Sequence, residues 1–180
     1  MIRLFDFLFS LIGLIILSPL IILIFILCLF ESRYPIFKQK RVGCNQKLFD
    51  LIKFRTMKKE TRSVATHLVD NSMITRYGNF LRRSKLDEVP QLFNVLIGNM
   101  SFVGPRPCLL NQKKLIRERQ KRGVFKVKPG ITGLAQLSGI TMETPTLLAK
   151  TDLKMVNKMN LYYYFYYILR TFLLIFKKSS

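Results

Sequence analysis

Acidic residues are scarce in this sequence. It has 10 Asp and Glu residues against 30 Lys and Arg residues, which gives a formal net charge of +20. Such an imbalance implies an anionic partner, which is a nucleic acid, an anionic lipid or a phosphorylated substrate. However, 49% of the residues are hydrophobic and 15 are Phe, which is unusually apolar for a soluble nucleic-acid-binding protein. The composition therefore favours a membrane surface as the partner.

Histidine and cysteine are also rare. The one histidine, His67, lies in a polar stretch and is predicted to be an ordinary surface residue. The three cysteines (Cys28, Cys44 and Cys108) match no zinc-binding, redox or disulfide spacing. The sequence also has no Gly-rich nucleotide-binding loop, internal repeat or low-complexity tract. These absences argue against a zinc site, a thiol redox site, a disulfide framework and a Gly-rich nucleotide site. The length of 180 residues fits one compact domain.

A long apolar run occupies residues 7–30 and contains no charged residue. It exceeds the roughly 20 residues that a membrane helix needs, and no cleavage site for a signal peptide follows it. Ser18 and Pro19 lie in its middle, where proline is expected to kink a helix. Basic residues flank the run on both sides, so the positive-inside rule favours a segment that enters and leaves on the same side. A kinked single span is the alternative.

The remaining periodicity predicts a mainly helical α+β fold. Residues 48–54 alternate as in a short strand, and residues 58–74 are polar, as in a loop or an irregular helix. Residues 77–81 and 111–122 have helical spacing, and the second of these segments is highly charged. Residues 161–176 are apolar and begin with a tyrosine cluster, but a helix of about 24 Å is short for a span. We therefore predict a helix at the membrane interface, with a buried core helix as the alternative.

Two adjacent acids, Asp87 and Glu88, stand out in this basic chain. Leu92, Val95 and Leu96 follow them as an apolar face with helical spacing. Asp87 is a suitable N-cap for that helix, where the helix dipole would favour its ionised form, and Pro90 would fall in the first turn. Gly98 is a suitable end for the helix. A role for Asp87 in capping alone, with Glu88 as first-turn charge, is the structural alternative to catalysis.

Basic residues surround this acidic pair. Arg82 precedes it, and Arg106 follows it between two prolines that restrict the loop. Carboxylates can act as nucleophiles and metal ligands, and guanidinium groups bind phosphate oxygens. The combination predicts a site for phosphate chemistry.

The central motifs closely resemble those of the bacterial sugar transferases, which are monotopic polyprenyl-phosphate phosphoglycosyl transferases. The resemblance covers nearly the whole chain, in order. It is carried by Phe37, Gln39, Arg41 and Gly43, by residues 53–57 (KFRTM), 86–96 (LDEVPQLFNVL), 100–107 (MSFVGPRP) and 128–133 (KPGITG), and by Ala135 and Gln136.

This resemblance implies a reaction. Sugar 1-phosphate would pass from a UDP-sugar to polyprenyl (undecaprenyl) phosphate with release of UMP, initiating a surface glycan that downstream glycosyltransferases extend. Asp87 would be the nucleophile that carries the phosphosugar covalently. Glu88, with Asp87, would bind Mg²⁺. The implied phosphate-binding residues are Arg82, Arg106, Lys53 and Arg55.

The resemblance also implies an architecture. Residues 1–32 would form a re-entrant membrane helix broken at Ser18 and Pro19, residues 33–150 the catalytic domain, and residues 151–180 an interfacial helix. The protein would lie among the lipids at the cytoplasmic face of the bacterial inner membrane. Three positions depart from the family pattern, because Asn99 stands in place of the usual Asp, Leu134 in place of Trp, and Lys128 in place of Arg.

Two other function classes fit parts of the sequence. A non-catalytic, membrane-anchored protein that binds anionic lipid would need the basic charge and apolar ends but neither Asp87 nor Glu88. A membrane-tethered nucleic-acid-binding protein would need aromatic residues among the basic ones, whereas the tyrosines lie in an apolar run. We therefore expect no nucleic-acid partner.

Overall fold

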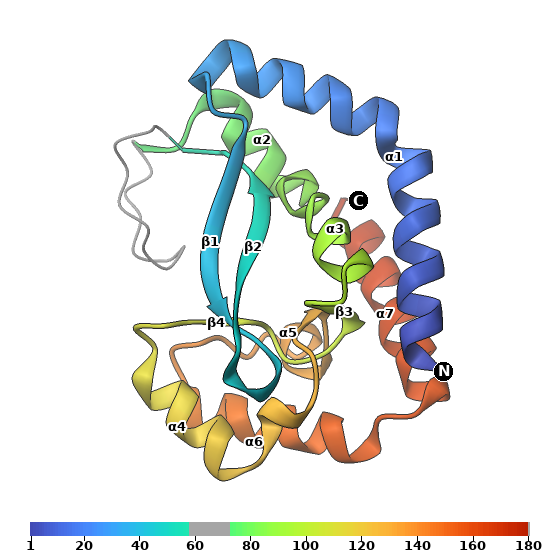
Figure 1. Ribbon diagram of the computed structural model, residues 1–180, viewed down its shortest axis with the longest axis vertical. Coiled ribbons are helices and arrows are strands. Elements are labelled where there is room, and N and C mark those ends of the chain that lie inside the picture. The colour runs from blue at the N-terminus through green and yellow to red at the C-terminus, as the bar shows by residue number, and fades with distance from the viewer. Residues whose placement is uncertain (58–72, 180) are drawn as a thin grey trace.

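The computed structural model describes residues 1–57 and 73–179, which form helices around two small sheets (Figure 1). The mainly helical α+β fold is confirmed, whereas His67 and most of the predicted loop at 58–74 lie outside the described residues. The elements are α1 (Ile2–Ser32), β1 (Ile36–Val42), η1 (Cys44–Gln46), β2 (Leu48–Phe54), α2 (Arg76–Arg83), η4 (Leu86–Glu88), α3 (Gln91–Leu96), β3 (Ser101–Val103), β4 (Cys108–Leu109), α4 (Lys113–Lys121), η5 (Val124–Lys126), β5 (Gly130–Thr132), α5 (Leu134–Leu137), α6 (Pro145–Lys158) and α7 (Leu161–Ser179).

Helix α1 is bent near its middle, as Figure 1 shows, and Pro19 lies inside it. Proline has no N–H, so it cannot donate to the carbonyl of Ile15, four residues earlier. The Ser18 hydroxyl donates to that carbonyl instead, at 2.7 Å. The predicted kink is therefore confirmed, and the Ser-Pro pair explains how α1 bends without leaving a polar group unpaired. By length and composition α1 could cross a membrane, and most of its surface is exposed.

Both halves of α1 are attached to the rest of the protein. Near the N-terminus, Arg3 donates to the carbonyls of Val95 and Leu96, the last two residues of α3. Buried Asp6 accepts three hydrogen bonds, from the Ser101 hydroxyl, the Phe102 amide and the Tyr164 hydroxyl. In the second half, the core residues are Ile24 and Cys28, which pack in a cluster with Phe54 and Leu81. The bend thus directs the two halves toward two parts of one body.

The central strands form a hairpin that carries site residues. Strands β1 and β2 pair antiparallel, and β4 adds to the other edge of β1. The predicted strand at 48–54 has the same bounds as β2. A second sheet pairs β3 with β5 in parallel. Gly104 follows β3 so close to the carbonyl of Lys128 that a side chain there would collide with it. Glycine at this point lets the two chain segments touch and fixes the start of the next loop.

The C-terminal part consists of α6 and α7. Helix α6 continues across the predicted boundary at residue 150, and the next break lies between Lys158 and Leu161. The predicted helix at 161–176 is present as α7. Its Tyr164 and Tyr167 are buried against α1 and β3, whereas Tyr162, Phe172 and Leu173 are among the exposed large side chains. Helix α7 therefore combines a core-facing side with an exposed apolar side.

Candidate active site

The acidic pair lies in a short 3₁₀ turn between α2 and α3. Asp87 and Glu88 belong to η4, and the N-cap of α3 is Pro90, which makes no side-chain capping bond. The prediction that Asp87 caps this helix is therefore wrong. In η4 each amide donates to the carbonyl three residues earlier, and the last amide to do so is that of Val89. Pro90 has no N–H with which to continue this pattern, so the α-helix begins after the proline. Gly98 ends the helix as predicted, with a φ of 88°.

Glu88 is held by two cations. Lys53 Nζ lies 2.7 Å from Glu88 Oε1, and Arg106 Nη2 lies 3.3 Å from the same oxygen. Burial would raise the pKa of Glu88, but the two cations outweigh it and lower this pKa from 4.5 to about 2. Glu88 is therefore a permanently charged centre of the cluster at neutral pH.

Asp87 differs from its neighbour. Its side chain is buried, and its nearest ionic partner is Lys53 Nζ, 3.9 Å from Asp87 Oδ2. It accepts no hydrogen bond from a residue in 1–57 or 73–179. Burial raises the pKa of Asp87, and Lys53 opposes this rise. The expectation that a helix dipole favours the anion of Asp87 loses its basis, because Asp87 lies in η4 and not at the N-terminus of α3. A poorly solvated carboxylate with few hydrogen bonds is a reactive one.

Arg82 acts on the side of Asp87. Its Nε donates to the Thr56 hydroxyl at 2.8 Å, and this anchors the guanidinium group. Burial lowers the pKa of Arg82, and Asp87 opposes this effect. The terminal nitrogens make no hydrogen bond to the part of the chain that the structure describes. They are therefore available to an anionic ligand.

Arg41 belongs to the cluster but was not among the predicted site residues. It donates to the Pro107 carbonyl at 3.0 Å and to the Gln39 side chain. Burial and the nearby Arg106 lower the pKa of Arg41 to about 10. The motif in which it lies was visible in the sequence, but only the pairing of β1 with β4 shows that this residue approaches Arg106.

Lys85 is the other residue that sequence reasoning missed. It has a φ of 61°, which is uncommon for a residue with a side chain, and it caps η4. Its charge opposes the rise in the pKa of Asp87 and helps to lower the pKa of Glu88. Its position two residues before the acidic pair was the available signal.

Arg55 is directed elsewhere. Its Nε donates to the Tyr34 carbonyl at 2.9 Å, and its guanidinium group lies 5.5 Å from the centre of the Phe37 ring. The structure thus brings Lys53, Arg82 and Arg106 to the acidic pair and gives Arg55 other partners. Its predicted role in phosphate binding stays a prediction.

The carboxylates fit a magnesium ion that shares its ligands with a substrate. The described residues contain no group of three or more His, Cys, Asp or Glu side chains that could form a complete metal site. Mg²⁺ is commonly held by one or two carboxylates together with phosphate oxygens and water. Asp87 and Glu88 can supply the carboxylates, and a bound diphosphate would supply the rest.

The three departures from the family pattern lie away from the acidic pair. Asn99 is exposed, Leu134 packs in the cluster of Met155 and Tyr164, and Lys128 lies beside Gly98. None of the three makes a hydrogen bond or ion pair with Asp87 or Glu88 among the described residues.

Comparison with known proteins gives a consistent result. A family model described as "Bacterial sugar transferase" matches residues 1–178. The chain is 48% identical over 103 residues to "Uncharacterized sugar transferase EpsL" of Bacillus subtilis (strain 168), covering 57% of this chain and 50% of that protein. It is 42% identical over 147 residues to "UDP-glucose:undecaprenyl-phosphate glucose-1-phosphate transferase" of Escherichia coli (strain K12), covering 79% and 32%.

A third relative is covered more evenly. The chain is 38% identical over 149 residues to "Exopolysaccharide production protein PSS" of Rhizobium leguminosarum bv. phaseoli, covering 77% of this chain and 74% of that protein. The first two relatives are longer, and the chain spans about half and about a third of their lengths.

Proposed function

Because the chain belongs to the bacterial sugar transferase family, we propose that it transfers sugar 1-phosphate from a UDP-sugar to polyprenyl phosphate. UMP would be released, and the lipid-linked product would initiate a surface glycan that downstream glycosyltransferases extend. The observation that carries this proposal is the buried Asp87 beside an ionised Glu88 whose negative charge is balanced by Lys53 and Arg106. A protein that only bound anionic lipid would have no use for this arrangement.

The reaction consists of two displacements at one phosphorus atom. In the first, a carboxylate oxygen of Asp87 attacks the β-phosphorus of the UDP-sugar, and the bond from that phosphorus to the bridging oxygen breaks. UMP leaves with the bridging oxygen, and Asp87 holds the phosphosugar as an acyl phosphate. In the second, an oxygen of polyprenyl phosphate attacks the same phosphorus, and the carboxylate of Asp87 is released. Two steps let one small site accept two large anions in turn.

The surrounding residues divide this work. Asp87 can attack because it is buried and because none of the described residues donates a hydrogen bond to its carboxylate oxygens. Glu88 orders Lys53 and Arg106, whose charges offset the repulsion between a carboxylate and a diphosphate. Arg82, anchored on Thr56, would bind phosphate oxygens with its free terminal nitrogens.

Magnesium is part of the proposal. Asp87 and Glu88 are the residues that would hold it, together with the diphosphate. When bound, Mg²⁺ supplies positive charge that stabilises the phosphate oxygens during displacement.

The membrane arrangement that we propose is monotopic, with α1 re-entrant. Support comes from the two halves of α1, which pack on opposite parts of one body, Asp6 on β3 and Cys28 beside Phe54. A straight span would place its ends on opposite sides of the bilayer. Exposed apolar side chains on other helices would lie at the headgroup level, including Phe80 and Phe93. The site would then face polyprenyl phosphate at the cytoplasmic surface of the bacterial inner membrane.

The proposal is tested by radiolabelled transfer in detergent from a panel of UDP-sugars to undecaprenyl phosphate. Transfer from at least one sugar, lost in Asp87→Asn, is the expected result. Absence of transfer from every sugar, with tight binding to anionic vesicles retained, would instead favour the membrane-anchored lipid-binding protein.

A further inference from the structure

The backbone of the loop that carries Arg106 accepts a hydrogen bond from a second arginine. Arg119, on α4, donates from Nη1 to the Arg106 carbonyl at 2.8 Å. It also lies against Cys108, where its charge opposes the burial that raises the pKa of this thiol. Arg41 donates to the carbonyl of Pro107 between them. The carbonyls of Arg106 and Pro107 are therefore each held by an arginine, while the Arg106 side chain reaches Glu88.

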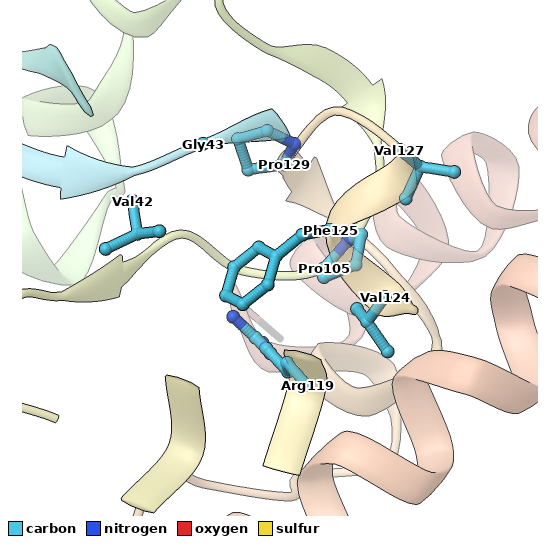
Figure 2. Close-up of a pocket in the computed structure, with 8 residues that line it drawn as sticks. All are labelled: Val42, Gly43, Pro105, Arg119, Val124, Phe125, Val127 and Pro129. Atoms are coloured by element: carbon cyan, nitrogen blue, oxygen red, sulfur yellow. The ribbon is translucent and has the colours of Figure 1, made fainter. Parts of the chain in front are cut away.

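Arg119 is an unusual residue to find in this place. Arg119 is 1% exposed, and its side chain reaches from α4 into a small pocket beside Pro105 and Phe125 (Figure 2). Of the eight residues drawn there, Arg119 alone carries a charge. The other lining residues, among them Val124, are apolar. A buried charge of this kind requires a partner.

The partner is Asp152 of α6, which is fully buried. Asp152 Oδ2 lies 2.9 Å from Arg119 Nε and 2.8 Å from Nη2. The other oxygen, Oδ1, accepts no hydrogen bond from a described residue, and burial raises the pKa of Asp152 in spite of Arg119. Buried ion pairs with incomplete hydrogen bonding contribute little net stability, and apolar residues often replace them without loss. Stability alone therefore gives no reason for this pair.

We propose that Arg119 and Asp152 form a buried positioning pair that sets the direction of Arg106. Asp152 fixes the guanidinium plane of Arg119, Arg119 fixes the Arg106 carbonyl, and the flanking prolines transmit this constraint to the Arg106 side chain. This inference rests on the proposed function for its effect on turnover, since the charge of Arg106 there offsets the repulsion between Asp87 and the substrate diphosphate. The constraint on the loop itself does not depend on that function.

The test compares the full-length protein with the double variant Arg119→Met/Asp152→Leu, which removes both buried charges. Two readouts are used: hydrogen exchange of peptides covering 104–109, and steady-state sugar-phosphate transfer. We expect exchange in this segment to be about 10-fold faster, with the α3 peptide unchanged. Turnover should fall roughly 10- to 100-fold, as misplaced binding groups commonly cause.

A double-mutant cycle distinguishes positioning from general damage. If Arg119 acts through Arg106, the swap should cause no further loss of turnover in an Arg106→Ala background. The matched control is Arg122→Gln, which changes the C-cap residue of the same helix and breaks its 2.6 Å ion pair with Glu118. This control should retain wild-type exchange and turnover.

Wild-type exchange and turnover in the double variant would overturn the proposal, as would losses that multiply with that of Arg106→Ala. If the swap fails to fold, Arg119→Lys keeps the charge but cannot match the fork that joins Asp152 to the Arg106 carbonyl. The same faster exchange is then expected, and unchanged exchange would overturn the proposal. If the wild-type protein transfers no sugar phosphate, the proposed function fails, and the exchange of 104–109 still decides whether the pair holds the loop.

Discussion

Replacement of Lys53 by Met should destabilise the protein and separate the chemistry of the site from its surface charge. Lys53 Nζ lies between the two carboxylates, 2.7 Å from Glu88 and 3.9 Å from Asp87, and its side chain is 17% exposed. Methionine keeps the length and apolar stem of lysine but removes the ammonium group. The change therefore leaves Glu88, whose side chain is 16% exposed, with Arg106 as its remaining ionic partner among the described residues.

The magnitude follows from the pKa of Glu88. Its fall from 4.5 to about 2 corresponds to about 3 kcal/mol in favour of the ionised form in the folded protein. Lys53 contributes the larger share, since it is closer than Arg106 and also donates a hydrogen bond, so we assign about 2 kcal/mol to it. For a chain of 180 residues this predicts a melting temperature lower by about 4–8 °C.

Thermal melting in detergent measures this effect, with Lys40→Met as the matched control. Lys40 lies on the paired strand and forms an ion pair with Asp50 of similar length, 2.9 Å, but its side chain is 61% exposed. An exposed pair is worth less than about 1 kcal/mol. The control should therefore melt within about 2–4 °C of the wild type. Equal losses in the two variants would refute the reasoning.

The effect of pH on the same comparison has a definite sign. The pKa of Glu88 is lower in the folded than in the unfolded protein, so the unfolded state binds more protons between pH 4.5 and about 2. The stabilisation is complete above pH 4.5 and is lost as the pH falls toward 2. The difference in melting temperature between wild type and Lys53→Met should therefore narrow over this range, and a difference that widened would contradict the assignment.

Four further perturbations test the phosphate contacts, the metal requirement and the membrane arrangement. Arg82→Ala should lower kcat/KM by about 10²-fold, and Arg82→Lys should recover only part, because an ammonium group cannot use the Thr56 anchor and bind phosphate as a fork does. Chelation should abolish transfer and added Mg²⁺ restore it, whereas full activity in excess chelator would show that the cations suffice. Pro19→Ala should straighten α1 by restoring the hydrogen bond to Ile15. With the native cysteines replaced, single cysteines introduced near Arg3 or near Lys38 should be inaccessible from outside the cell in the parent, and labelling of either would contradict the re-entrant arrangement.

Local features of the fold were predictable from sequence. The strand at 48–54, the kink at Pro19 and the helix around Phe80 depend on periodicity and on proline geometry, and all three are present. The start of α3 was not predicted, because an Asp followed three residues later by Pro fits both a capped helix and a 3₁₀ turn. Only the hydrogen-bond pattern distinguishes them.

The candidate site was predicted in its acids but less well in its cations. Adjacency in sequence identified Asp87 and Glu88, and the prolines identified Arg106. Lys53 was expected only to bind phosphate, although it is the residue that lies within 4 Å of both acids. This contact depends on how β2 packs against η4, which no local pattern encodes. The role of Asp6 was missed for the same reason, since its three donors come from β3 and α7.

Detection of the covalent intermediate tests most directly whether Asp87 is the nucleophile. Wild-type protein would be incubated with its UDP-sugar donor and no lipid acceptor, quenched, digested and analysed by mass spectrometry. We expect a mass increase of one phosphosugar on the peptide containing Asp87, and no adduct in a folded Asp87→Asn variant. Asparagine has the same shape, and Asp87 accepts no hydrogen bond from the described residues, so this variant should fold. An adduct on Glu88, or normal turnover in Asp87→Asn, would contradict the account.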